Sequence, residues 1–392
     1  MSELTLADAL EVLIDHRGKT PKKMGGDFTA QGVKVISALL VKNGKLDLSE
    51  ARHVDDDMHD KWMRVKTKRH DVVLTSEAPL GRCALIPDDD RYVLGQRVFG
   101  LRGRPGVLDS RYLFYALQTP TVQAQLTGRA TGTTVLGIRQ SELVKIRIPA
   151  RDYREQQAIA ATLGALDDKI AVNDRIATTA DSLRSALLEY ARQRRPHDFT
   201  TTPLSQVADF INGRAFTKDA TGTGRMVIRI AEINSGPGSS TVYNDIAVDD
   251  KYLARPGDVL FSWSGSLAVA RWFRSEAIIN QHIFKVIPRD NNPHWLAFEA
   301  VRSRLAHYRA IAADKATTMG HIQRHHLDED VEVPNSEAIT HLDPSAKNLW
   351  LRALEAEQES LRLAALRDAL LPELMSGRLR VRDAEKVVEE AV

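Results

Sequence analysis

The stretch LRSALL at residues 183–188 returns as LRDALL at residues 366–371, in a chain of 392 residues. Other segments match in the same order along the two halves. In the first half they are HDVVLTS at 70–76, VLGQRVFGL at 93–101, YLFYAL at 112–117, Thr133 with Thr134, and KIRIP ending at Pro149. Their counterparts are GDVLFSW at 257–263, IINQHIFKV at 278–286, WLAFEA at 295–300, Thr317 with Thr318, and DVEVP ending at Pro334. So many matches in one order indicate an internal duplication.

Each half opens with short apolar runs separated by Gly, Asn and Asp, a pattern typical of strands and turns in a mixed α/β domain. The strands predicted in the first half are VKVISAL at 33–39, DVVLTS at 71–76, CALIP at 83–87, VFGLR at 98–102 and KIRIP at 145–149, with a helix over 112–126. Those predicted in the second half are MVIRIAEI at 226–233, DVLFSW at 258–263, IFKVI at 283–287 and VEVP at 331–334.

A long charged stretch that lacks proline follows Pro149 and predicts a helix of about 40 residues, roughly 60 Å long. Ile159, Leu166, Asn173, Ala180 and Leu187 recur every seven residues, with Ile176, Leu183 and Tyr190 as a companion row. This is a heptad seam, which needs a partner helix. Apolar residues of the matching second stretch are Leu351, Leu354, Leu361, Leu366 and Leu370. Pro372 is expected to disturb the last turns of this helix, which stops at Gly377. The two helices are predicted to form a rod that holds two globular domains apart.

Asn173 is the one polar residue in the predicted seam. A polar residue in a seam fixes the register of the pairing at some cost in stability. The alternative is a water-exposed asparagine at the edge of a broad apolar stripe.

Composition sets broad limits on function. The net charge of +2 and pI near 8.5 name no nucleic-acid partner by themselves. The single cysteine, Cys83, excludes an internal disulfide and is interpreted as a small core residue in a reducing compartment. No apolar stretch long enough for a membrane span and no basic leader is present, so a cytoplasmic protein is expected.

REQQAIAATLGALDDKI at 154–170 and LRDALLPELMSGRLRV at 366–381 closely resemble the conserved regions of type I restriction-modification specificity subunits. HRGKTP, GDVLFS, NQHIF and GTT resemble the signposts of that family's target recognition domains. The sequence departs from the pattern at His70, where glycine is expected, at Gly95, where asparagine is expected, and in AITHLDPSAKN, where the second helical region usually opens with EQxxI.

The resemblance implies a subunit without catalytic activity. It would read a split double-stranded DNA site, one half per recognition domain, with the paired helices acting as ruler and as docking surface for two methyltransferase subunits. Restriction/translocase subunits would complete the complex. No cofactor is expected on this chain; S-adenosylmethionine, and ATP with Mg in the full complex, are expected on the partners.

The predicted fold is α+β: two mixed α/β target recognition domains joined and separated by two long antiparallel coiled-coil helices, as a pseudo-two-fold repeat. The predicted divisions are a first recognition domain at 1–150, a first spacer helix at 151–196, a second recognition domain at 197–335, a second spacer helix at 336–380 and a C-terminal tail at 381–392.

The motifs that resemble enzyme active sites are incomplete in this sequence. Gly18, Lys19 and Thr20 end like a phosphate-binding loop, but Leu13 stands where its first glycine should be. No Pro-Pro pair exists for an adenine methyltransferase motif, and Asp88 lies in a run that is better interpreted as a solvated turn. His321 and His325 have a helix-like ligand spacing without the carboxylates or cysteines of a metal site, so no catalytic or metal residue is assigned.

Clustered basic and amide side chains are the candidate DNA contacts, since phosphates are held by cations and base edges by Arg, Gln and similar groups. In the first half they are Arg17, Lys19, Lys22, Lys23, Arg64, Lys66, Lys68, Gln96, Arg97, Thr133 and Thr134. In the second half they are Arg214, Lys218, Gln281, His282, Thr317 and Thr318. The run KWMRVKTKR would present one cationic face as a strand, or be an ordinary solvated strand edge. The threonines would donate to phosphate, or simply open a strand.

Two other functions stay open from the sequence. One is a catalytically inert scaffold of the same fold that binds only protein partners. The other is a complete DNA methyltransferase whose active site escapes detection.

Overall fold

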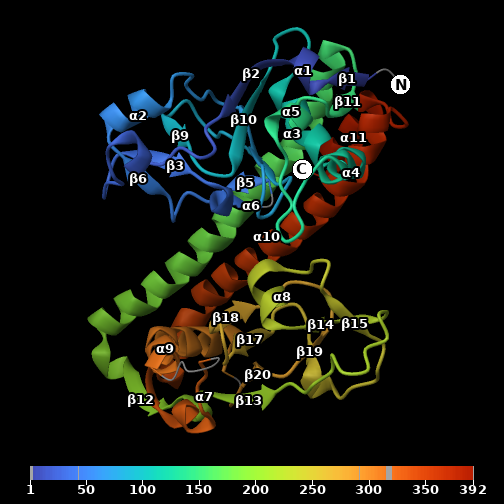
Figure 1. Cartoon of the computed structure of the whole chain (residues 1–392). Coiled ribbons are helices and arrows are strands. Elements are labelled where there is room, and N and C mark those ends of the chain that lie inside the picture. Colours follow the sequence, from blue (N-terminus) through green and yellow to red (C-terminus); the bar gives the residue numbers. More distant parts are fainter. Residues whose placement is uncertain (1–2, 43, 291, 315–319, 392) are drawn as a thin grey trace. The chain divides into compact units, whose positions relative to one another are not determined.

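The computed structural model describes residues 3–42, 44–290, 292–314 and 320–391. The chain divides into two compact units (Figure 1): unit 1 comprises residues 1–168 and 364–392, and unit 2 comprises residues 169–363. Two long helices, α6 (Tyr153–Arg194) and α10 (Ser336–Ser376), each contribute residues to both units. The divisions predicted above remain predictions; residues 381–391 of the predicted tail form a helix, α11 (Val381–Ala391).

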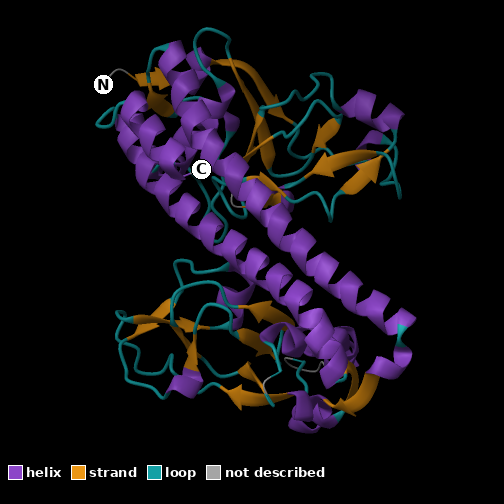
Figure 2. Ribbon diagram, turned by 180° about the vertical axis from the view of Figure 1, so that it is seen from behind, coloured by secondary structure: helices purple, strands orange, loops and turns teal. Residues whose placement is uncertain are grey.

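The globular part of unit 1 is built on small sheets flanked by helices (Figure 2). Its strands are β1 (Glu3–Thr5), β2 (Leu10–Asp15), β3 (Val33–Ile36), β4 (Val41–Lys42), β5 (Lys45–Leu46), β6 (Arg52–Val54), β7 (Val72–Thr75), β8 (Cys83–Leu85), β9 (Tyr92–Leu94), β10 (Val98–Gly103) and β11 (Arg147–Pro149). Its short helices are α1 (Leu6–Ala9), α2 (Asp56–Trp62), α3 (Ser110–Gln118), α4 (Pro120–Gly128) and α5 (Gln140–Leu143). The sheets have the orders β2-β10-β7-β8, β6-β3-β9, β1-β11 and β4-β5.

Unit 2 repeats this plan. Its strands are β12 (Phe199–Pro203), β13 (Ala208–Asn212), β14 (Arg225–Ile228), β15 (Val242–Asn244), β16 (Leu253–Ala254), β17 (Val259–Ser262), β18 (Ala268–Arg271), β19 (Ala277–Ile279), β20 (Ile283–Pro288) and β21 (Asp330–Pro334). Its helices are α7 (Leu204–Val207), α8 (Ile230–Ser235) and α9 (His294–Asp314). The sheets have the orders β13-β20-β17-β18, β15-β14-β19-β16 and β12-β21.

The duplication is confirmed in pairing and in hydrogen bonds. In each unit a four-stranded antiparallel sheet lies beside a sheet that contains one parallel pair, β3 with β9 and β14 with β19. The Ser76 N–H donates to the Arg97 carbonyl at 2.9 Å, and the equivalent Trp263 N–H donates to the His282 carbonyl at 3.1 Å. The two halves therefore share one backbone frame, and the predicted α+β fold with two long helices is correct.

The long helices begin at equivalent caps. The Arg154 N–H donates to the Asp152 carboxylate at 2.9 Å, and the Ala338 N–H donates to the Asn335 side-chain oxygen at 2.9 Å. Both are short polar side chains of the kind that satisfy the free amides of a first helical turn. At the other end of α10, Gly377 has a φ of +72°, which confirms the predicted helix stop.

Four predictions of local structure are wrong. The strand predicted over 33–39 ends at Ile36, and a 3-10 turn over Ala38–Leu40 follows. The helix predicted over 112–126 is two helices, because Thr119 ends α3 with an extended backbone and caps α4 at its N-terminus. The strand predicted over 226–233 ends at Ile228, and α8 follows. The run KWMRVKTKR is the end of α2 and then a loop, because Trp62 and Met63 are both buried, which a strand of alternating exposure does not allow.

Each globular part has its own apolar core. The core of unit 1 gathers around Trp62, Tyr92 and Ile36, and that of unit 2 around Trp295, Phe261 and Tyr308. Cys83 lies in unit 1, and its thiol donates to the Phe114 carbonyl at 3.7 Å. Burial raises the pKa of this thiol to about 12, so it is protonated at neutral pH and is a poor nucleophile.

His70, the departure from the expected glycine, keeps the backbone conformation that glycine would favour. Its φ is +68°, and the equivalent Gly257 has a φ of +94°. The following aspartates then play the same part: Asp71 accepts from the Lys68 N–H, and Asp258 accepts from the Arg255 N–H. The turn before β7 and β17 therefore needs a left-handed residue in both halves.

Gly257→Ala should lower the free energy of unfolding by about 1–2 kcal/mol, because L-residues lose about that much in the left-handed region. Space is not the cause, since the nearest atom to an added Cβ is Leu354 Cδ2 at 3.7 Å. Gly128→Ala is the control: it lies in α4 with nothing within 4 Å of its added Cβ, and it should gain about 0.4–1 kcal/mol. Urea unfolding of the two variants measures both, and an unchanged stability for Gly257→Ala would contradict the strain argument.

Candidate nucleic-acid interface and helix pair

Loops that are distant in the sequence meet at one end of the four-stranded sheet of unit 1. The Arg17 guanidinium donates to the Ile138 carbonyl at 2.8 Å, and the Ile138 N–H donates to the Ser76 carbonyl at 2.9 Å. The backbones of Glu77 and Gly137 form an isolated antiparallel β-bridge. The HRGKT loop, the loop after β7, the turn before β10 and the GTT loop therefore form one surface.

Arg17 holds this surface together from within. It makes a two-point contact with Asp15, with nitrogen–oxygen distances of 2.8 and 2.7 Å, and its guanidinium lies 4.1 Å from the centre of the Phe99 ring. Burial opposes ionisation of Asp15, but the hydrogen bonds and charge of Arg17 outweigh it and lower the pKa of Asp15. A phosphate contact by Arg17 remains a prediction, but its geometry already assigns it a structural part.

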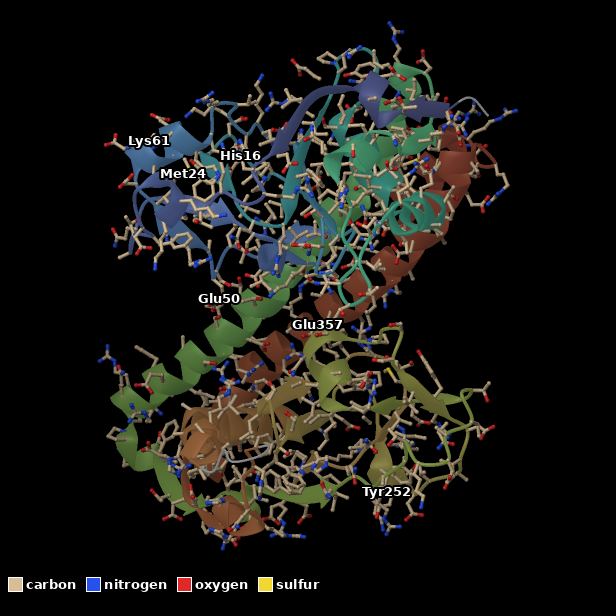
Figure 3. The ribbon with its side chains drawn as sticks, viewed as in Figure 1. His16, Met24, Glu50, Lys61, Tyr252 and Glu357 are labelled. Carbon is tan, nitrogen blue, oxygen red and sulfur yellow. The ribbon has the colours of Figure 1, made fainter. Side chains whose placement is uncertain are left out.

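The neighbouring histidine, His16, is labelled in Figure 3. Its pKa is lowered, first by burial and then by the charge of Lys19. It is therefore neutral at physiological pH and adds no cationic charge to the loop.

The lysines of the loop differ in exposure and in the hydrogen bonds of their ammonium groups. Lys19 is half-buried and its Nζ reaches the Trp62 carbonyl at 3.4 Å, while the Lys23 Nζ donates to the Gly18 carbonyl at 2.9 Å. Lys22 is exposed. Lys22 and Lys23 are thus the residues of this loop most accessible to a phosphate.

The turn before β10 presents two more candidates. Gln96 and Arg97 are exposed, and Arg97 has a φ of +64°. The Arg97 Nε lies 3.2 Å from the Glu77 carboxylate, so this arginine is oriented at the surface by a partner that sequence reasoning missed. Exposed ion pairs of this kind are weak and exchange readily for another anion.

The remaining candidates of unit 1 are more scattered. Arg64 and Lys68 are exposed in the loop after α2, and Lys66 is paired with Asp60. Thr133 and Thr134 are exposed in the GTT loop.

In unit 2 the equivalent loops meet in the same way but carry other side chains. The Gln281 N–H donates to the Arg214 carbonyl at 2.8 Å, and the Arg214 guanidinium lies 4.9 Å from the centre of the Tyr252 ring, labelled in Figure 3. Lys218 is exposed. Thr317 and Thr318 lie outside the described residues.

An aromatic cluster occupies the place of the Arg97–Glu77 pair. The Trp263 and His282 rings are 5.1 Å apart, and the Trp263 Nε1 donates to the Asn212 side-chain oxygen at 2.8 Å. His282 has a φ of +72°, as Arg97 does in unit 1. Trp263 and Asn212 were missed from the sequence, although the repeat places Trp263 opposite Ser76 and so marks the same loop.

The helix pair is antiparallel within each unit. In unit 1 the Arg151 guanidinium donates to the Met375 carbonyl, and that of Arg367 donates to Asp167 at 2.6 Å. In unit 2 the Asn173 amide donates to Glu359 at 2.9 Å. Residues later in α6 therefore contact residues earlier in α10.

Burial corrects the register of the predicted seam. Ile159, Leu166, Asn173 and Ala180 are buried as predicted, and the exposed-asparagine alternative is wrong because Asn173 is 1% exposed. The companion row is wrong: Leu183 and Tyr190 are 53% and 59% exposed, and Ile176 is only partly buried. The buried companion row is instead Leu163, Ile170, Ala177 and Arg184.

The predicted seam of α10 is likewise displaced. Leu351 is 41% exposed, while Leu354, Leu361 and Leu366 are partly buried and Leu370 is buried. In unit 2 a buried apolar cluster is formed by Ala177 and Ala180 of α6 with Ala353 and Ala356 of α10. Leucines were favoured from the sequence, whereas small side chains allow the closer approach.

Among the described residues, no group of three His, Cys, Asp or Glu side chains is placed to hold a metal ion. In the same residues, no helix is both long and apolar enough to cross a membrane.

The model of the type I restriction modification DNA specificity domain matches residues 1–179 and again residues 196–337. The chain belongs to this family. Each match contains one of the two surfaces described above, so the family's domain is present twice.

Known relatives agree in part of their length. The type I restriction enzyme MjaVIII specificity subunit of Methanocaldococcus jannaschii is 27% identical over 151 residues, which is 37% of this chain and 36% of that protein. The MjaIX specificity subunit of the same organism is 32% identical over 99 residues, 25% of this chain and 22% of that protein. The matched parts are thus about a third or less of the relatives' length.

A solved structure covers more of the fold. The S subunit of a type I restriction-modification system from M. genitalium has a TM-score of 0.57 and 17% identity, and the match covers 95% of each chain. At this identity the likeness concerns the fold.

Arg17→Met should lower the free energy of unfolding by about 1.5–3 kcal/mol at neutral pH, because hydrogen bonds to a charged group are lost while the apolar stem stays. The pKa of Asp15 is lowered in the folded chain, so its stabilisation is present above the usual value of 3.8 and is lost as pH falls through the folded value. The difference between wild type and variant should therefore shrink in acid. Urea unfolding at neutral and at acid pH measures it, with exposed Lys22→Met as a control expected within about 0.5 kcal/mol of wild type.

Proposed function

We propose that this chain is the DNA specificity subunit of a type I restriction-modification complex. It reads a bipartite site in double-stranded DNA, one half-site for each recognition domain, and carries no catalytic activity of its own. The observation that supports this most strongly is one loop frame built twice with a shared exposed glutamine, Gln96 or Gln281, and a different residue after it, exposed Arg97 in one half and partly buried His282 in the other. Two loops with the same backbone and different side chains are suited to recognise two different DNA sequences in the same geometry.

The proposed contacts divide by chemistry. Lys22, Lys23 and Lys218 are exposed cations suited to phosphates, which position a protein on DNA without reading sequence. Arg97 and Gln96 offer donors and acceptors suited to base edges. In the second domain the Trp263 and His282 rings add flat surfaces beside Gln281.

The helix pair is proposed as ruler and docking surface. Its α6 carries a second apolar row, Val172, Ile176 and Leu183, which lines a groove with Leu349 and is flanked by Arg175 and Arg352. Ile176 and Leu349 also pack against the alanines of the seam, whereas Val172 and Leu183 are 38% and 53% exposed. A groove between two helices accepts an amphipathic helix of a partner.

The partners proposed are two methyltransferase subunits, with restriction/translocase subunits in the full complex. S-adenosylmethionine, and ATP with Mg, would bind to those subunits. A cytoplasmic location belongs to the same proposal, since DNA and these cofactors are found there.

Deleting the gene should remove methylation from one bipartite motif in the host genome, and restoring it should return methylation at the same motif. Methylation-aware sequencing of the two strains measures this and also gives both half-sites and the gap. Replacing residues 1–150 with the equivalent domain of a relative should then change one half-site only. Unchanged methylation in the deletion strain would overturn the proposed function.

Leu183→Asp should weaken binding of the methyltransferase subunit by at least about tenfold, because a charge is buried in an apolar groove; tenfold corresponds to about 1.4 kcal/mol. Leu183 is 53% exposed, so the fold itself should be little affected. Leu39→Asp, at a leucine 76% exposed in unit 1, is the matched control and should bind as wild type does. Copurification and titration of the two subunits give the comparison, and normal binding by Leu183→Asp would exclude this surface.

A further inference from the structure

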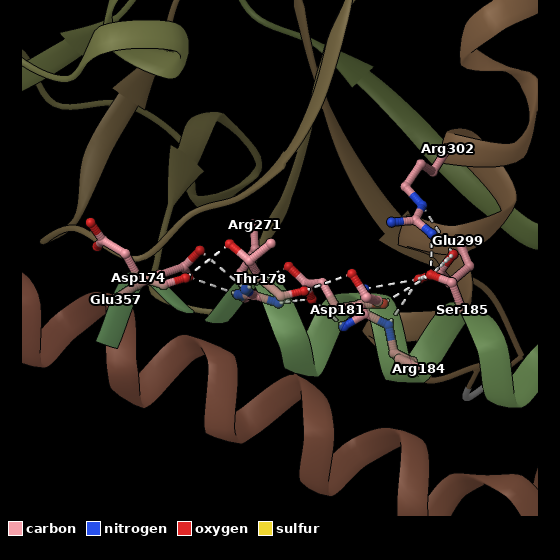
Figure 4. Close-up of polar contacts among 10 residues, drawn as sticks. Asp174, Thr178, Asp181, Arg184, Ser185, Arg271, Glu299, Arg302 and Glu357 are labelled. Atoms are coloured by element: carbon pink, nitrogen blue, oxygen red, sulfur yellow. Dashed lines mark hydrogen bonds and ion pairs between the residues drawn. The ribbon is translucent and has the colours of Figure 1, made fainter. Parts of the chain in front are cut away.

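A single buried arginine joins the second globular domain to both long helices. Arg271, the last residue of β18, is 5% exposed. Its guanidinium contacts Glu357 of α10 at 2.9 and 3.1 Å and Asp181 of α6 at 3.1 Å. It also lies 4.5 Å from the centre of the Trp350 ring (Figure 4 shows the ionic contacts).

A second buried arginine extends the same network. Arg184 of α6 is fully buried and contacts Asp181 at 2.6 Å and Glu299 of α9 at 3.0 Å. Its guanidinium lies 5.2 Å from the Phe298 ring of α9. Ser185 donates to the same Glu299 carboxylate at 3.2 Å, as Figure 4 shows. The network therefore holds the domain through β18 and α9 together, at two points along α6.

The pKa values of the two carboxylates shift in opposite directions, although burial raises both. Burial raises the pKa of Glu357 in spite of its contact with Arg271. For Asp181, burial is outweighed by the hydrogen bonds and charges of Arg271 and Arg184, and its pKa is lowered. Ionisation of Asp181 is therefore favoured by its arginine partners. Ionisation of Glu357 is disfavoured by its burial.

Such a network is a poor way to gain stability alone. Taking charges out of water costs several kcal/mol per ion, and apolar packing of the same volume is often as stable. Buried ion pairs instead fix the geometry of the elements that carry them, because a guanidinium can hydrogen-bond to two carboxylates only in one orientation. Apolar surfaces can slide by a fraction of a turn, and this network cannot.

The positions equivalent to Arg271 and Asp181 carry apolar residues in the first half of the repeat. Pairing of β7 with β8 and of β17 with β18 places Leu85 opposite Val72 where Arg271 lies opposite Val259. The alignment of LRSALL with LRDALL places Ala364 of α10 at the position equivalent to Asp181. The three-way contact therefore distinguishes the second half of the repeat from the first.

We propose that Arg271 is a positioning residue for DNA reading: with Asp181 and Glu357 it fixes the second recognition domain on the helix pair, so that this domain's half-site is accepted at one distance and helical phase. This rests on the proposed function. The residue itself contacts no DNA, since it is buried.

The experiment uses the complex of the full chain with its methyltransferase subunit and the bipartite motif that sequencing of the host defines. Binding is measured on duplexes with the native gap and with gaps one base pair shorter and longer. Arg271→Gln should bind the native gap within about threefold of wild type and lose at least about tenfold of the discrimination against the altered gaps, where tenfold corresponds to about 1.4 kcal/mol. The preferred bases of each half-site should not change.

Arg255→Gln is the matched control. Arg255 also contacts two carboxylates, Asp250 and Glu276, but all three lie within the globular domain. Its loss should leave gap discrimination as in wild type. If Arg271→Gln does not fold, as judged by circular dichroism, Glu357→Gln is measured by the same criteria, because it keeps the Asp181 contact of Arg271.

The outcomes separate the two ideas. If Arg271→Gln, or Glu357→Gln in its place, weakens binding equally for all gaps, or if Arg255→Gln relaxes the gap as much, the positioning role is overturned while the specificity function stands. If wild type recognises no bipartite site, the proposed function fails and this inference fails with it.

Discussion

The arginine of the repeated LR(S/D)ALL stretch is the contact on which the rest of the fold depends. Each long helix leaves one globular domain and ends against the other, and the arginine lies at that far end. Arg184 of α6 contacts Glu299 of the second domain. Arg367 of α10 contacts Asp167, whose other oxygen accepts the Tyr115 hydroxyl of the first domain at 2.6 Å. Most of the stability of a helix in a protein comes from packing of its apolar face. The duplicated stretch thus supplies the same kind of contact within each unit.

The duplication and the two helices could be predicted because their signals are local and repeated. The caps Asp152 and Asn335 and the stop at Gly377 are single residues whose chemistry sets a helix end wherever they occur. The seam was predicted only in one of its two rows. Apolar Leu183 favoured one companion row from the sequence, while the buried row contains Arg184. A fully buried arginine is rare unless it is paired, and its partner Glu299 is distant in the sequence. No periodicity reveals such a pair.

The loop surfaces show the same limit. Both halves place a non-glycine residue in the left-handed region before β10 and β20, and this could be inferred only once the turn was seen. Arg17 was predicted as a phosphate contact because it is basic and lies in a glycine loop, yet its charge is used by Asp15. Whether a basic side chain faces solvent or a carboxylate depends on the fold of its neighbours. Composition therefore identifies the loop, and the structure distinguishes the side chains within it.

Register in the helix pair is set by two different kinds of contact. In unit 2 the alanines of α6 and α10 allow a close approach, but four small apolar side chains define no single alignment. Polar contacts supply it. Asn173 of α6 donates to Glu359 of α10, and Arg271 joins Asp181, which follows Ala180 on α6, to Glu357, which follows Ala356 on α10. A shift of either helix by one turn would separate buried Asn173 and Arg271 from their carboxylates, at a cost far above that of repacking alanines. The close contact thus supplies proximity, and the costly polar groups select one alignment from the several that alanines would accept.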